Sequence, residues 1–317
     1  MNWIKTKISE LKAKAKKVFR KMPTLSDIKT SPWVSTECGP VLKSDLKKNL
    51  FQCPKCNKNQ RIEYAKDRFD VFFGEGKYEI IDIPIDKDLD DPLKWSDTKP
   101  YIERLKQARK KTNSNCAVEW ASGTLSNGIQ VTCGAISFAH LGGSIGLHEG
   151  HTISKGIDKA IERKTPLIFF AAGGGQRMYE SAIALQMMTL TTAKISEFKQ
   201  TGLAYISCLV DPCFGGITAS FASLGDINLS EDNARIGFAG PRIIKAQTPG
   251  EIIEDSFQSS QFLLKHGQCD AIFARKDLNE KIGTLLSILL KKNEIKIISD
   301  DGTEQDREFI KRTATST

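Results

Sequence analysis

The chain has 317 residues with 40% hydrophobic content, enough for one well-buried core domain and a small appended segment. No run of about 18 apolar residues occurs, which argues against a transmembrane helix. The eight cysteines are too scattered for a disulfide framework and suit a reducing compartment. Residues 1–22 are basic but lack the apolar centre of a secretory signal, so we expect a cytoplasmic protein.

The net charge of +8 is unevenly distributed. Residues 1–61 hold 15 Lys and Arg against 4 Asp and Glu, a net +11, and the remainder has a net charge of −3. Apolar residues at roughly helical spacing predict a basic amphipathic helix within residues 1–31. We favour docking of this helix on its own domain. A contact with nucleic acid or a membrane surface is the alternative.

In chain order, residues 32–62 form a cysteine-containing segment, and 63–115 are predicted to be mostly helical and polar. A β-hairpin is predicted next, with strands 117–125 and 129–138 joined across the favoured turn pair Asn127-Gly128. Short apolar strands then alternate with helices up to residue 291, which predicts an α/β layered domain followed by a polar tail, 292–317. We expect strands at 166–172, 203–210, 235–238 and 271–273, and helices at 150–163, 177–200, near 216, at 258–266 and at 277–291.

Three glycine-rich turns stand out: HLGGSIG (140–146, the first turn), AAGGGQRM (171–178, the second turn) and DPCFGGITASFA (211–222, the third turn). In the second and third, a strand, a Gly-Gly turn and a helix follow one another. This layout presents backbone N–H groups at a helix N-terminus, as an oxyanion hole or a phosphate cradle does. Neither GxxxxGK[ST] nor GxGxxG spacing is present. Tight turns without a ligand are the alternative, but three in one domain favour a site.

Conventional side-chain chemistry has little support in the main domain. The sequence contains no HExxH and no GxSxG, and its four histidines show no metal-type spacing. The pattern therefore favours a chemistry that relies on backbone amides and a reactive cofactor.

Longer motifs carry a resemblance to a known family. They are MNWI (1–4), NLFQCPKC (49–56), LKWSDTKPYIERLKQA (93–108), FAHLGGSIG (138–146), GGGQRMYE (173–180), DPCFGGITASFASLGDINLSE (211–231), IGFAGPRII (236–244) and QFLLKHGQCDAI (261–272). In content, order and spacing they resemble the β subunit of the acetyl-CoA carboxylase carboxyltransferase of bacteria and plastids. The resemblance implies a crotonase-like α/β fold of stacked β-β-α turns over residues 63–291, preceded by a small zinc-ribbon-like segment at 32–62.

The resemblance also implies a function. The family transfers a carboxyl group from carboxybiotin to acetyl-CoA and forms malonyl-CoA for fatty-acid synthesis. It implies an α subunit in an α2β2 assembly, biotin on a biotin carboxyl carrier protein, a biotin carboxylase, and a cytoplasmic or plastid-stroma location. Negative charge develops on a biotin oxygen and on the thioester oxygen, and each amide donor to such an oxygen is worth roughly 3–4 kcal/mol.

The resemblance assigns site residues to the positions of this sequence that match the family's motifs. The amides of Gly174, Gly175 and Gln176 are expected to face the biotin oxygen. Gly142, Gly143, Gly215 and Gly216 are expected to form walls of the CoA and biotin channels, and Arg177 to hold the turn or a CoA phosphate. Two stretches depart from the family pattern. The second turn has AAGGGQRMYES for SASGGARMQEA, which puts Gln176 in an alanine position, and LHEG (147–150) replaces SVVG.

The family's ribbon holds zinc with two CxxC pairs. Cys53 and Cys56 form one pair here, and Cys38 matches one member of the other, whereas Ser35 stands where its partner cysteine is expected. Because structural zinc takes four ligands, two outcomes remain open. Either three thiolates bind zinc with Glu37, Asp45 or water, or the ribbon is metal-free.

Two further functions remain as alternatives. One is a relative that acts on another acyl-CoA, or a malonate decarboxylase subunit, which the MNWI start and the cysteines disfavour. The other is a non-catalytic member that binds partners or RNA through its basic segment.

Overall fold

The structure is a computed structural model that describes residues 32–249, 254 and 256–290. The chain divides into two units, residues 1–60 and 61–317. The predicted basic helix within 1–31 and the predicted tail at 292–317 lie outside the described residues. Within the described ranges, no helix has the length and apolar run that a membrane crossing requires.

The described part of the first unit is a hairpin followed by a short helix. Strands β1 (Trp33–Thr36) and β2 (Gly39–Leu42) pair antiparallel, and α3 (Lys43–Lys48) follows directly. Gly39 turns the chain with a φ of +99°, a conformation that glycine adopts without a steric penalty. Val41, Leu46 and Cys53 form a small core of their own.

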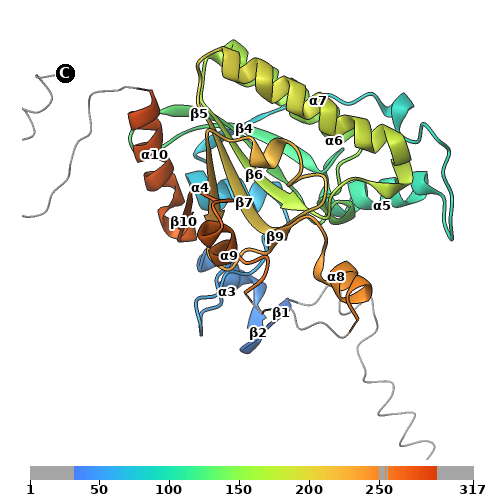
Figure 1. Cartoon of the computed structure of the whole chain (residues 1–317), viewed down its shortest axis with the longest axis horizontal. Coiled ribbons are helices and arrows are strands. Elements are labelled where there is room, and N and C mark those ends of the chain that lie inside the picture. Colours follow the sequence, from blue (N-terminus) through green and yellow to red (C-terminus); the bar gives the residue numbers. More distant parts are fainter. Residues whose placement is uncertain (1–31, 250–253, 255, 291–317) are drawn as a thin grey trace, which may run out of the picture. The chain divides into compact units, whose positions relative to one another are not determined.

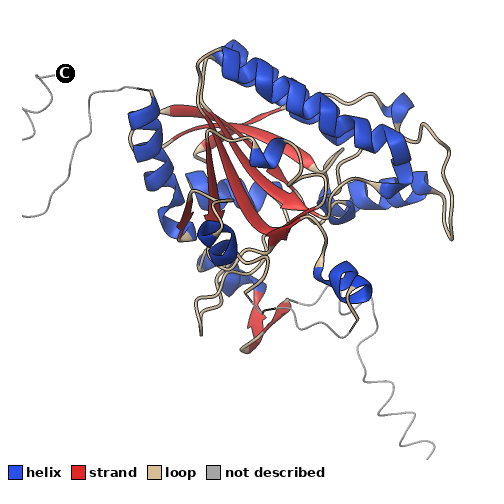
Figure 2. Cartoon of the chain, in the orientation of Figure 1, coloured by secondary structure: helices blue, strands red, loops and turns tan. Residues whose placement is uncertain are grey.

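The second unit is built on one mixed sheet, shown in red in Figure 2. The strand order is β10-β8-β7-β6-β5-β4-β3, and β9 pairs with β7. The pairs β3–β4 and β4–β5 are antiparallel, and the pairs from β5 through β6, β7 and β8 to β10 are parallel. The strands are β3 (Tyr78–Ile81), β4 (Val118–Thr124), β5 (Gln130–Ile136), β6 (Leu167–Gly173), β7 (Tyr205–Phe214), β8 (Ile227–Glu231), β9 (Ile236–Gly237) and β10 (Ala271–Phe273).

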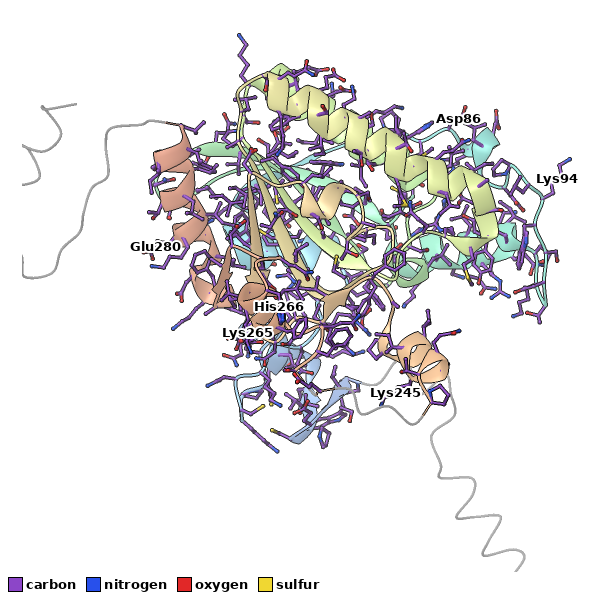
Figure 3. All side chains as sticks on the ribbon, viewed as in Figure 1. Asp86, Lys94, Lys245, Lys265, His266 and Glu280 are labelled. Atoms are coloured by element: carbon purple, nitrogen blue, oxygen red, sulfur yellow. The ribbon has the colours of Figure 1, made fainter. Side chains whose placement is uncertain are left out.

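Helices cover both faces of this sheet (Figure 1). Helices α6 (Leu147–Arg163) and α7 (Ser181–Gln200) pack on one face, and α4 (Ala65–Phe73) and α10 (Leu278–Leu289) on the other. On α10 the exposed Glu280 points away from the sheet (Figure 3). The other helices are α5 (Tyr101–Thr112), α8 (Pro241–Gln247), α9 (Ser260–Lys265) and the 3-10 turns η1 (Lys87–Leu89), η2 (Leu141–Gly143), η3 (Met178–Glu180), η4 (Phe221–Ser223) and η5 (Arg275–Asp277).

Burial on both faces explains the sequence of the central strand β6. Its residues LIFFAAG are all buried, as expected of a parallel strand between two helical layers. Phe169 packs toward α6 and α7, whereas Ile168 and Phe170 pack toward α4 and α10. The alternation of side chains along a strand thus divides the apolar residues between two cores.

The predicted alternation of strands and helices is confirmed, and so is the hairpin. The hairpin loop, however, has three residues. Leu125 N–H donates to Ile129 O at 2.9 Å, and of the loop residues only Gly128 has a positive φ, of +85°. The loop therefore resembles a type I turn with a bulge, because the two-residue Asn-Gly turn requires a positive φ at both residues.

Two element predictions are wrong. Residues 63–115 contain strand β3, which lengthens the antiparallel edge of the sheet. The helix expected near Gly216 is replaced by irregular turns and η4. There Thr218 Oγ1 donates to Gly215 O at 2.8 Å and Ser220 Oγ to Gly216 O at 2.6 Å. Hydroxyls that bind nearby carbonyls compete with helical hydrogen bonds.

The contact between α6 and β4 gives a test of the fold. A Cβ on Gly156 would lie 1.9 Å from Trp120 Cε2, and Trp120 is fully buried. We expect Gly156→Ala to lower the free energy of unfolding by about 1–3 kcal/mol, despite a gain in helix propensity of about 1 kcal/mol. Urea denaturation measures the change. The exposed Lys155→Ala on the same helix should stay within about 0.5 kcal/mol, and a Gly156→Ala protein as stable as wild type would contradict this packing.

Candidate active site

The three glycine turns lie beside one another because of the sheet topology. The first follows β5, the second includes the end of β6 and the third includes the end of β7, and these strands are parallel neighbours. The carboxyl ends of neighbouring parallel strands meet at one edge of a sheet, where ligands of such sheets bind.

Backbone contacts between glycines join the turns directly. A Cβ on Gly143 would lie 3.0 Å from Gly173 Cα, and a Cβ on Gly215 would lie 3.0 Å from Gly175 Cα. A Cβ on Gly173 would lie only 2.2 Å from Gly143 O. The turns therefore stack in the order first, second, third, and a side chain at Gly143, Gly173 or Gly215 would be crowded by the backbone of the adjacent turn.

The hydrogen bonds of the second turn leave two amides free. Gly174 N–H donates to Gly142 O at 3.0 Å, and Arg177 N–H donates to Ile145 O at 2.8 Å. Between them, the N–H groups of Gly175 and Gln176 donate to no group in the described part of the chain. Gly175 is buried and Gln176 is half-buried. Backbone N–H groups away from water are almost always paired, so two adjacent free ones offer a place for a ligand oxygen. Of the three candidate amides, that of Gly174 is occupied within the protein.

These amides do not begin an α-helix. The second turn leads into η3, and α7 starts only at Ser181, so the expected helix N-terminus is absent at this turn. The free N–H groups are oriented instead by the stacked turns, and the dipole of a long helix does not act on them directly.

The Gln176 side chain turns away from its own N–H. Its Nε2 donates to Ala184 O on α7 at 2.8 Å, and its buried Oε1 has no partner among the described residues. Its Cγ lies 2.7 Å from where a Cβ on Gly216 would stand. The larger side chain in the family's alanine position thus packs across Gly216 and against α7.

The four glycines predicted as channel walls all flank the second turn. Gly142 O accepts from Gly174, and Gly143 N–H donates to His140 O at 2.9 Å. Gly215 N–H is shared between Gly237 O and Phe238 O, at 3.3 and 2.8 Å. Gly216 is buried beneath the Gln176 side chain.

Arg177 is a buried residue with partners from three parts of the chain. Its guanidinium lies 2.8 Å from Glu149 Oε1 and 3.3 Å from Glu180 Oε1, and its Nη2 donates to Ser144 O at 2.6 Å. Burial opposes the charge of Glu149, but Arg177 holds the pKa of that carboxyl down at about 2. Only 2% of Arg177 is exposed, so the geometry favours the turn-holding role over contact with a CoA phosphate.

Sequence analysis missed the partners of Arg177, namely Tyr101, Ser144, Glu149 and Glu180. Glu149 stands three residues after Gly146, at the position where a carboxylate caps a helix N-terminus, and it does accept from Gly146 N–H at 3.0 Å. That spacing was the one sequence feature that pointed to a role for Glu149 at this turn. Nothing local to Tyr101 indicates that its hydroxyl reaches Glu180, 79 residues away, at 2.5 Å.

In the first unit, Cys38, Cys53 and Cys56 bring their sulfurs within 4.8 Å of one another. Backbone N–H groups of Lys55 and Cys56 lower the pKa of Cys53 to about 6, which favours its thiolate. Ser35, on β1, is exposed. Three thiols at this spacing fit three of the four ligands of a structural zinc ion.

Comparison with known proteins identifies the family. The carboxyl transferase domain family matches residues 96–307. A Pelagibacter ubique protein named acetyl-coenzyme A carboxylase carboxyl transferase subunit beta is 46% identical over 314 residues, 99% of this chain and 100% of the relative. This chain belongs to that family of carboxyl transferase β subunits. A member from Mesorhizobium japonicum is 39% identical over 293 residues, 92% of each chain.

Solved structures confirm the crotonase-like fold of this carboxyl transferase β subunit. Transcarboxylase 12S with hydrolysed methylmalonyl-coenzyme A matches with a TM-score of 0.54 and 21% identity, over 71% of this chain and 40% of that chain. A Pseudomonas malonate decarboxylase hetero-tetramer in complex with malonate matches with a TM-score of 0.52 and 21% identity, over 79% and 89%. The solved structures thus confirm the predicted fold. The family model and the curated relatives confirm the predicted family and the class of biotin-dependent carboxyl transferase.

His140, which opens the first turn of this carboxyl transferase β subunit, predicts a pH dependence. It is fully buried, its Nδ1 lies 3.2 Å from Thr112 Oγ1, and its Nε2 has no partner in the part of the chain that the structure describes. Burial lowers the pKa of His140 to about 4, below the ordinary value of about 6.5. The unfolded chain therefore binds a proton at this residue at a higher pH than the folded chain, and stability falls as the pH drops from 6.5 toward 4.

We expect His140 to contribute a loss of up to about 1.4 kcal/mol per pH unit in that window. Urea denaturation at pH 7, 6 and 5 measures the slope. His140→Asn, which cannot take up the proton, should show a flatter profile, and a variant profile parallel to wild type would contradict the assignment.

Proposed function

We propose that this chain, paired with an α subunit, transfers the carboxyl group of carboxybiotin to acetyl-CoA and forms malonyl-CoA. Two observations support the proposal: membership of the family, and the free N–H groups of Gly175 and Gln176 at the edge where the central strands end. The resemblance further suggests an α2β2 assembly, a biotin carboxyl carrier protein, a biotin carboxylase and a cytoplasmic location.

Carboxybiotin, when bound, supplies the carboxyl group, and the chain's own residues supply fixed hydrogen-bond donors. We assign the amides of Gly175 and Gln176 to the biotin oxygen, because they are adjacent and donate to no group in the described residues. Gly174 orders the turn through its bond to Gly142. Gly143, Gly215 and Gly216 bring the neighbouring turns close enough to hold those amides in place.

Fixed amides suit a reaction whose charge develops on an oxygen. Donors that are already oriented stabilise such charge without reorganising during the reaction, and removal of one oxyanion donor typically costs 10²–10³ in rate. A titrating side chain is not required for this task. We therefore assign no acid or base role to His140 or to Glu149.

Displacement of the amides provides the test. Gly175 has a φ of +105°, and an added Cβ would lie 3.3 Å from Gly215 Cα. We expect Gly175→Ala to lower the turnover of malonyl-CoA decarboxylation with free biotin by about 10²-fold, measured on this chain co-expressed with its α subunit.

The matched control is Gly202→Ala. Gly202 also has a positive φ, of +74°, but it lies in the turn after α7 and has no atom within 4 Å of an added Cβ. It should lose stability and keep its turnover. Equal turnover in the two variants would refute the placement of the biotin site, and no turnover in a well-formed wild-type complex would refute the function itself.

We propose further that Cys38, Cys53 and Cys56 hold a zinc ion, with an exchangeable fourth ligand in place of the missing cysteine. The spacing of the three sulfurs supports this, and the serine at position 35 explains why the site would bind metal more weakly than a four-cysteine ribbon.

Restoration of the fourth thiol tests the zinc site. Thr36→Cys should lower the Kd for zinc by at least tenfold, because Thr36 Oγ1 already lies 3.7 Å from Cys53 Sγ, whereas the neighbouring Ser35 faces the opposite side of β1. Competition with a chromophoric chelator measures the change. Ser44→Cys, an exposed serine in the same unit, adds a thiol outside the cluster and should leave the Kd unchanged. Equal zinc affinity in wild type and Thr36→Cys would contradict the proposed geometry.

A further inference from the structure

A buried group of charged and polar side chains lies directly behind the free amides. We call Arg177, Glu149, Glu180, Tyr101 and Ser144 the Arg177 cluster. Arg177, Glu149, Glu180 and Tyr101 are each at most 2% exposed, and they come from the second turn, α6, η3 and α5, respectively. With one cation and two carboxylates, the cluster is costly to bury unless every charge is hydrogen-bonded.

Each carboxylate of the cluster is hydrogen-bonded to backbone at the end of the first turn or beside it. Glu149 accepts from the N–H groups of Gly146 and Ala117, both at 3.0 Å. Glu180 accepts from Leu147 N–H and from the Tyr101 hydroxyl, both at 2.5 Å. Arg177 alone could not hydrogen-bond all four carboxylate oxygens. These donors pair the oxygens that would otherwise be buried without a hydrogen bond.

Arg177 joins these carboxylates to the second turn. Its side chain binds Ser144 through Nη2 to the carbonyl at 2.6 Å and through Nε to the hydroxyl at 3.2 Å. Its backbone N–H binds Ile145 O, and Ile145 N–H binds Gly175 O at 2.9 Å. The residue that follows Gln176 is thus held to the first turn by both its main chain and its side chain.

A glycine beside the Arg177 cluster leaves space for the Glu180 carboxylate. A Cβ on Gly146 would lie 2.4 Å from Glu180 Oε1, so a residue with a side chain would push that carboxylate away. The free amides of Gly175 and Gln176 lie between two anchors, the Gly174–Gly142 bond on one side and Arg177 on the other. A shift of either anchor moves both N–H groups.

We propose that the Arg177 cluster is a positioning device for the oxyanion donors, and that Tyr101 is a positioning residue within it. The inference rests on the proposed function, because it explains how the two N–H groups are held in the orientation that the biotin oxygen requires. Tyr101 donates to Glu180 and accepts from Arg177 Nη1 at 3.1 Å. Loss of its hydroxyl leaves the geometry of both partners less constrained without removing a charge.

A cluster that only stabilises the fold would behave differently in kinetics. Donors that act in the transition state change kcat and leave KM nearly constant, whereas a purely structural defect lowers the amount of folded enzyme. Turnover per folded complex, together with KM for malonyl-CoA, therefore separates the two roles.

The experiment uses Tyr101→Phe in the complex with the α subunit and follows malonyl-CoA decarboxylation with free biotin. We expect kcat to fall about tenfold, with KM within about twofold of wild type. Ser144→Ala removes a hydroxyl that accepts from Arg177 Nε and donates to Leu141 O at 2.9 Å. It should lower kcat by a smaller factor and serves as the variant least prone to misfold. The matched control is Tyr78→Phe, which removes a phenol-to-carboxylate bond of 2.7 Å to Asp70 at the β3 edge of the sheet.

The outcomes are distinct. A lower kcat at constant KM in Tyr101→Phe and Ser144→Ala, with Tyr78→Phe near wild type, supports the positioning role. Unchanged kcat in both cluster variants, or a decrease equal to that of Tyr78→Phe, overturns it. Absence of turnover in the wild-type complex would instead count against the proposed function, so the two failures cannot be confused.

Discussion

The approach of the backbones of three glycine-rich turns to one another is the constraint on which this molecule depends. Side chains normally keep neighbouring loops several ångströms apart. Here Gly143 and Gly173, and then Gly175 and Gly215, leave no space for even one Cβ between successive turns. The parallel order of β5, β6 and β7 brings the turns to one edge, and the glycines then allow their main chains to contact one another.

This contact explains how ordinary peptide groups become available for a ligand. When turns stack through their main chains, most of their N–H groups are used by the adjacent turn, as that of Gly174 is. The N–H groups of Gly175 and Gln176 donate to no group in the described residues, and they lie where the second turn bends between its two anchors. Covalent geometry and hydrogen bonds fix their orientation in advance. The donors therefore need no reorganisation when charge develops on an oxygen.

The buried charges of the Arg177 cluster contribute more to geometry than to stability. Burial of ion pairs seldom stabilises a protein more than apolar packing of the same volume would, because each charge loses its hydration. Arg177, Glu149 and Glu180 are therefore weak evidence for stability. Directional hydrogen bonds specify a geometry that apolar contacts do not, and the ones in this cluster join the two turns whose relative position defines the free amides.

The sequence by itself determined the features that local pattern controls. Alternating apolar runs predicted the layered α/β domain, Asn127-Gly128 predicted the hairpin, and adjacent glycines marked the three turns, because strand burial and turn conformation depend on neighbouring residues. Only the tertiary structure decided which amides are free and what surrounds Arg177. The acceptor for Gly174 lies 32 residues earlier in the chain, and Tyr101 is 79 residues from Glu180. Such partners meet only when the sheet orders its strands, so no local pattern of residues could have indicated them.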